Sequence, residues 1–146
     1  PLFSRLLLEP SNTDDGNLTV REVFELGLHT KLVTLSACET GQSYSASGTD
    51  FIEQDRIGLI EAFLHAGSAS VLATLLPVSD QPTTEFMKHF YSQLRDNKSR
   101  AEALATTQRA MLRGQISLPS SAQDPNSFPL THPRYLAPFI LVGDFR

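Results

Sequence analysis

The chain has 146 residues, 40% of them hydrophobic and 8% aromatic, which is enough for one domain with a buried core. Its formal net charge is −4 without a basic cluster, which argues against nucleic acid as a direct partner. No apolar run approaches the roughly 20 residues that span a bilayer, so no membrane partner is expected. A single cysteine excludes an internal disulfide, and we expect a protein of the reducing cytoplasm.

The first residues, "PLFSRLLLEP", carry apolar side chains from Leu2 to Leu8 that need a partner surface at once. We therefore expect residues 1–146 to be a portion of something longer. After a polar turn, Thr19 and Glu22 have the spacing of a capping box, in which each residue bonds the other's backbone. This pair predicts a short helix that ends near Leu26.

Two short apolar runs, over 32–36 and 70–76, predict buried β-strands. Between them, apolar side chains at helical spacing predict a helix over about 53–65. The buried face of this predicted helix consists of Ile57, Ile60, Phe63 and Leu64.

The second half of the chain predicts two more helices and a strand. The first helix has Pro82 in its opening turn, where proline is tolerated, and ends near Asn97. Ser99 and Glu102 form a second capping box and open the next helix. A long loop rich in Ser and Pro then leads to a last strand over 139–142. The buried stripe of the first helix consists of Phe86, Met87, Phe90, Tyr91 and Leu94.

This alternation of strands and helices predicts an α/β fold with a parallel sheet covered by helices. Ligand sites of such sheets lie at the carboxyl ends of the strands. Cys38 follows the first predicted strand and Asp80 follows the second, so we expect both at one edge. Gly41 permits a sharp turn beside the cysteine. The alternative for Cys38 is a small buried apolar residue, as free cysteines often are.

The stretch "LSACETG", Leu35 to Gly41, resembles the nucleophile motif of CHAT domains, which are caspase-like and separase-like cysteine peptidases often joined to TPR repeats. Six further segments resemble family segments in the family's order, so the resemblance covers nearly the whole chain. It implies a caspase-like parallel-sheet sandwich covered by helices, of which residues 1–146 form the C-terminal portion. The six segments are "PLFSRLLLEP", "LTVREVFEL", "IGLIEAFLHAGSASVLATLLPVSD", "FMKHFYSQL", "KSRAEAL" and "HPRYLAPFILVGDF".

The resemblance implies cleavage of a protein or peptide substrate by a Cys–His dyad with Cys38 as the nucleophile. Glu39 and Gly41 are candidate substrate-binding residues of the same turn, although Glu39 also fits a surface position. Asp80 matches an acidic position that, in separase-like relatives, faces a basic side chain before the cleaved bond. Its alternative role is the N-cap of the following helix. We expect neither a cofactor nor a metal ion.

Four histidines are candidate bases for Cys38, and the predicted topology argues against each. His29, His65 and His132 precede strands, which places them at the opposite edge of an all-parallel sheet. His89 lies along a helix, roughly 10–13 Å from the edge that carries the cysteine. The family's His-Gly motif lies upstream of the segment matched by the first ten residues. The resemblance therefore implies that an N-terminal half of the same domain supplies the histidine.

Three functions compete at this stage. The first is a cysteine endopeptidase whose partners are its substrate, the N-terminal half of the domain and possible TPR repeats or a regulator. The alternative is a non-catalytic pseudo-peptidase that binds a partner as an interaction module. A small-molecule site on a flavodoxin-like sheet is the weakest of the three, because no Gly-rich phosphate-binding loop follows a strand.

Overall fold

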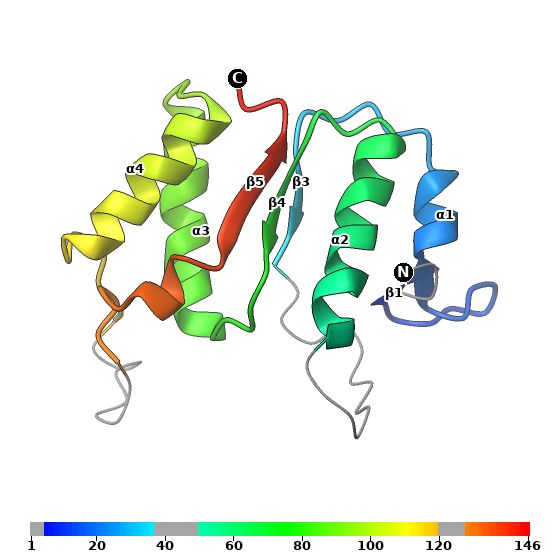
Figure 1. Ribbon diagram of the computed structural model, residues 1–146, viewed down its shortest axis with the longest axis horizontal. Helices are drawn as coiled ribbons and strands as arrows, with labels where there is room; N and C mark the ends of the chain where they lie inside the picture. The colour runs from blue at the N-terminus through cyan, green and yellow to red at the C-terminus, as the bar shows by residue number, and fades with distance from the viewer. Residues whose placement is uncertain (1–4, 37–49, 120–127) are drawn as a thin grey trace.

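The computed structural model describes residues 5–36, 50–119 and 128–146, which form a three-layered α/β unit (Figure 1). A sheet of three strands stands in the middle, with helices α3 and α4 on one face and α1 and α2 on the other. None of the helices in these ranges combines the length and the apolar character that crossing a bilayer requires.

The chain opens with a small antiparallel hairpin that the sequence did not predict. Strand β1 (Arg5–Leu7) pairs with β2 (Asn17–Thr19), and only the middle side chain of β1, Leu6, is partly buried. Three residues per strand are too few for the alternation of polar and apolar residues to stand out. Leu6 packs against the core on the α1–α2 face, which meets part of the need for a partner surface at this end.

Helix α1 (Val20–Phe24) begins at the predicted capping box and is shorter than predicted. The backbone N–H of Glu22 donates to Thr19 Oγ1 at 3.3 Å, and Glu22 Oε2 accepts from the backbone N–H of Thr19 at 2.8 Å. Gly27 follows with φ +49°, a left-handed conformation that ends helices. Val20 and Val23 turn inward to the core.

The central sheet has the order β3-β4-β5. Strands β3 (Val33–Leu35) and β4 (Ser70–Thr74) are parallel, with Val33 opposite Val71, and helix α2 (Asp50–His65) connects them in the chain. This part of the predicted topology is confirmed. Helix α2 begins three residues earlier than predicted, and Ile60 and Phe63 are buried as expected.

The prediction of an all-parallel sheet is wrong for β5 (Phe139–Gly143), which runs antiparallel to β4 with Phe139 opposite Thr74. Two helices, α3 (Asp80–Arg95) and α4 (Arg100–Leu112), separate these strands and pack against each other as a helical hairpin. The first helix carries the chain away from the carboxyl end of β4 and the second brings it back (Figure 1). Strand β5 therefore starts at the edge where β4 ends.

Successive residues of β4 serve opposite faces of the sheet, as strand geometry requires. Leu72 belongs to the core under α3 and α4, whereas Val71 and Ala73 belong to the core under α1 and α2. All five residues of this strand are buried. The predicted stripe of α3 is confirmed at Phe86 and Phe90, which are both fully buried.

Candidate functional site at the carboxyl edge of the sheet

The candidate site is the edge at which β3 and β4 end. Because these strands are parallel, their carboxyl ends lie side by side, with Leu35 opposite Ala73. Cys38 is the third residue after Leu35 in the sequence. Cys38, Glu39 and Gly41 fall within 37–49, outside the described residues, and their predicted roles stay predictions.

Asp80 follows β4 and is exposed at the start of α3. The alternative that it is the N-cap of this helix is wrong, because Ser79 holds that position with an extended backbone and Asp80 is the first helical residue. A carboxylate in the first turn is favoured by the helix dipole. In the described part of the chain Asp80 has no ion-pair partner, which leaves its charge available to a ligand.

Three of the four histidines lie where the sequence predicted. His29 lies four residues before β3 and His65 ends α2, so both are at the amino ends of the parallel strands. The ring of His65 packs edge-to-face on Phe24, with centroids 4.9 Å apart. His89 of α3 contacts α4, where its Nδ1 lies 3.0 Å from Oγ1 of the fully buried Thr107.

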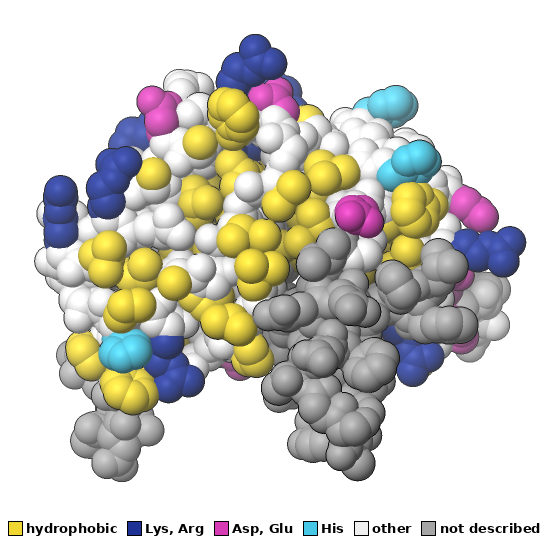
Figure 2. All heavy atoms as spheres, viewed as in Figure 1, with side chains coloured by type: hydrophobic (Ala, Val, Ile, Leu, Met, Phe, Trp, Pro, Cys, Tyr) yellow, Lys and Arg dark blue, Asp and Glu magenta, His cyan; other side chains and the backbone are white. Residues whose placement is uncertain are grey.

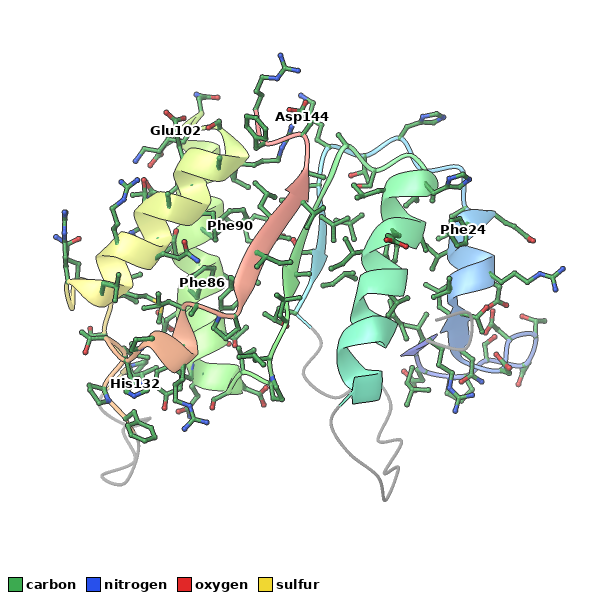
Figure 3. The ribbon with its side chains drawn as sticks, in the orientation of Figure 1. Phe24, Phe86, Phe90, Glu102, His132 and Asp144 are labelled. Atoms are coloured by element: carbon green, nitrogen blue, oxygen red, sulfur yellow. The ribbon has the colours of Figure 1, made fainter. Side chains whose placement is uncertain are left out.

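His132 is the exception, and its predicted placement is wrong. The backbone N–H of Leu75, just after β4, donates to the carbonyl of Pro138, just before β5, at 3.0 Å. The loop that leads into β5 therefore lies at the carboxyl edge, and His132 belongs to it (Figure 3). The earlier placement assumed a parallel last strand, and the antiparallel direction of β5 reverses it. Strand β5 is still separated from β3 by β4, about 10 Å across the sheet.

The outer side of β3 pairs with no other strand in the described ranges. All three residues of β3 are only partly buried, in contrast to the five buried residues of β4. On one face, Thr34 Oγ1 lies 2.7 Å from the hydroxyl of Tyr91, which is 48% exposed although the sequence placed it in the buried stripe of α3. A further strand paired with this side of β3 would lie next to the carboxyl end of β3, after which Cys38 follows in the sequence.

The described residues do not meet the requirements of a metal site. No three His, Cys, Asp or Glu side chains of the described ranges lie close enough together to hold a metal ion. What the described geometry brings to one edge is the end of β3, Asp80 after β4, and the loop before β5.

Comparison with known proteins defines the class of the domain as peptidase-like. The family model of the CHAT domain matches residues 1–144, and the chain belongs to this caspase-like peptidase family. It is also similar to tetratricopeptide repeat protein 28 of Homo sapiens, with 32% identity over 127 residues, or 86% of this chain. The chain spans only 4% of the length of that relative.

Sequence reasoning did not single out Arg134, which lies beside His132 at the same edge. Its guanidinium carbon lies 5.2 Å from the ring centroid of Phe128 and 5.7 Å from that of Tyr135. The spacing Phe128, His132, Arg134 and Tyr135 carries no periodic signal, and only the direction of β5 gives it a place near the site.

Proposed function

We propose that the complete domain is a cysteine endopeptidase that cleaves a protein substrate, with Cys38 as the nucleophile. The observation that supports the proposal is the parallel pair β3–β4 in a chain of the CHAT family, because Cys38 follows the first of these strands in the sequence and Asp80 follows the second. A Cys–His dyad needs its imidazole at this same edge. The N-terminal half of the same domain supplies it beside the outer edge of β3, which pairs with no strand of the described residues.

The proposed reaction starts with the thiolate of Cys38, which a neighbouring imidazole favours by taking the proton. The sulfur attacks the scissile carbonyl, and backbone N–H groups of the turn that contains Gly41 stabilise the resulting oxyanion. The imidazolium then protonates the leaving amine, and water hydrolyses the thioester. Glu39 orients the turn against the substrate. Asp80 binds a basic side chain that precedes the cleaved bond.

Cys38→Ala should reduce cleavage of a protein or peptide substrate by about 10³-fold or more, because the variant lacks the nucleophile. The assay compares residues 1–146 alone with the same chain mixed with the upstream part of the domain. We expect activity only in the mixture, since His29 and His65 lie at the opposite edge and His89 is bound to Thr107. Efficient Cys38-dependent cleavage by the chain alone would show that His132 or another of its own histidines serves.

Asp80→Ala should reduce cleavage after Arg or Lys by about 10- to 100-fold, because a charge-assisted contact to the substrate is lost. Cleavage of matched substrates with a neutral side chain at that position should change little. Asp96→Ala is the control, since Asp96 is an exposed carboxylate at the other end of the same helix. Equal losses for basic and neutral substrates would assign Asp80 to the stability of α3 instead of to specificity.

The second candidate function is a pseudo-peptidase that binds a partner without cleaving it. It is favoured by the placement of His29, His65 and His89, none of which faces the carboxyl edge. Alkylation decides between the two functions, because Cys38 is the only thiol in the chain. An activated thiolate reacts quickly with iodoacetamide well below the usual thiol pKa near 8.5, whereas an ordinary thiol reacts slowly there.

A further inference from the structure

A cation held between aromatic rings lies beside the start of β5. We call Phe128, His132, Arg134 and Tyr135 the Arg134 cluster. Arg134 is exposed, and no carboxylate of the described ranges forms an ion pair with it, in a chain whose net charge is −4. Phe128 and Tyr135 hold the guanidinium at cation–π distances of 5.2 and 5.7 Å.

The two rings orient the guanidinium before any ligand arrives. A planar guanidinium presents its N–H donors as a rigid fork that matches a carboxylate, and stacking on rings restricts its motion further. A side chain that is already ordered loses less conformational freedom when it binds. The Arg134 cluster therefore suits an oxyanion better than a freely moving surface lysine or arginine does.

His132 offers a second donor in the same cluster. Its Nδ1 accepts from the backbone N–H of Arg134 at 3.2 Å. A backbone amide can only donate, so Nδ1 carries no proton and the neutral ring carries its proton on Nε2. No described residue accepts from this Nε2–H in the hydrogen bonds of the structure. The ring is fixed by Phe128, whose centroid lies 4.4 Å away.

The donors lie beside aromatic rings, which limits the kinds of ligand that fit the cluster. Phe128 is 50% exposed and offers a ring face beside the guanidinium. A small inorganic anion would leave this ring in water, whereas a peptide with a carboxylate side chain next to an apolar one would cover it. The cluster precedes β5, whose first residue pairs with the last residue of β4, and His132 lies at this end of the molecule (Figure 3).

We propose that the Arg134 cluster is a binding subsite for an acidic segment of a partner protein, with the guanidinium of Arg134 and Nε2–H of His132 donating to a Glu or Asp carboxylate. Binding at the Arg134 cluster does not require catalysis by Cys38. The edge would then carry two binding groups of opposite charge, Asp80 at the start of α3 and Arg134 before β5.

The test measures binding of a short peptide by NMR on the whole chain in a Cys38→Ala background. The probe is acetyl-Gly-Phe-Glu-Leu-Gly-amide, and its partner probe has Gln in place of Glu. We expect saturable shifts of the Arg134 amide and the His132 ring with the Glu peptide, and about tenfold weaker binding of the Gln peptide. Arg134→Gln should weaken binding of the Glu peptide about tenfold, and Arg134→Lys should weaken it less.

The matched control is Arg109→Gln, which removes the same charge from an exposed position of α4. It should leave binding of the Glu peptide within twofold of that of the parent chain. Equal affinity for the Glu and Gln peptides would overturn the inference, and so would equal losses in Arg109→Gln and Arg134→Gln. Full displacement of the peptide by an equal concentration of inorganic phosphate would also overturn it, because a free anion would then suffice.

Discussion

The two faces of the central sheet are filled by different kinds of side chain. The core under α3 and α4 is rich in large residues, among them Phe86, Phe90 and Met111, all fully buried. The core under α1 and α2 is built mainly from valine and alanine, such as Val71, Ala62 and Ala73, with Phe63 as its one buried aromatic residue in the described ranges. The two faces of the sheet are therefore packed with side chains of different size.

The difference follows from how each layer of helices is made. Helices α3 and α4 form a hairpin, and aromatic rings stack between this hairpin and the sheet, with the centroids of Phe86 and Phe139 3.7 Å apart. On the other face, α2 contributes the small residue Ala62 to the core together with Ile60 and Phe63. Gly67, just after this helix, has φ +107°, and a Cβ there would collide with the carbonyl of Leu28. One face is filled by several aromatic side chains, whereas the other has a single buried aromatic residue in the described ranges.

Some apolar surface remains outside both cores. Hydrophobic side chains gather along the middle of one side of the molecule, over β5 and its neighbourhood (Figure 2). Ile140 and Val142 are only partly buried against the α1–α2 face, and Leu7 and Leu8 are more than half exposed near the hairpin.

The largest expected effect comes from emptying the aromatic face. Phe86→Ala should lower the free energy of unfolding by about 3–5 kcal/mol, because it leaves a cavity beside Phe139. Urea unfolding followed by circular dichroism measures this. Phe145→Ala is the control and should cost less than about 1 kcal/mol, since Phe145 is 61% exposed. Similar losses in both variants would remove the distinction between this core and the surface.

A smaller effect is expected from overfilling the other face. Ala62→Leu should lower the free energy of unfolding by about 1–3 kcal/mol, because Ala62 is completely buried where α2 meets the core. Glu61→Leu introduces the same side chain at the adjacent exposed position and should change stability by about 0.5 kcal/mol or less. If Ala62→Leu were neutral or stabilising in urea unfolding, the α1–α2 face would contain free space, and the contrast between the faces would fail.

The smallest effect concerns the capping boxes, one on each side of the sheet. Hydrogen bonds from Thr19 lower the pKa of Glu22, and hydrogen bonds from Ser99 lower the pKa of Glu102, each from an ordinary value of 4.5. The folded state then holds fewer protons than the unfolded state near this pH. Their contribution to stability is complete above pH 4.5 and is lost as the pH falls through the lowered values.

We therefore expect the melting temperature to decline as the pH falls from 5 to 3. The decline should be shallower in both Glu22→Gln and Glu102→Gln, which keep a hydrogen-bonding side chain without a titrating group. Differential scanning calorimetry at several pH values provides the measurement. A decline as steep in both variants as in the parent chain would assign the acid sensitivity to other carboxylates, such as Asp15 or Asp144, whose pKa values are also lowered.

Local signals in the sequence determined the helices and the strands of the central sheet, but not the hairpin β1–β2. The capping boxes at Thr19 and Ser99 begin α1 and α4 as predicted, because each depends on residues three apart in the chain. The short apolar runs gave β3 and β4, and helical spacing gave the buried side of α3. The resemblance of the segment around Cys38 to CHAT domains also agrees with the family match.

Tertiary structure alone decided what depends on the direction of the chain and on contacts far apart in sequence. The hairpin α3–α4 returns the chain to the carboxyl edge and makes β5 antiparallel, which no local pattern encodes. That reversal brings His132 and Arg134 to the edge shared with Asp80. The sequence indicated Asp80 because this residue follows a predicted strand. It did not indicate Arg134, because the contacts of its guanidinium with Phe128 and Tyr135 form only in the folded chain.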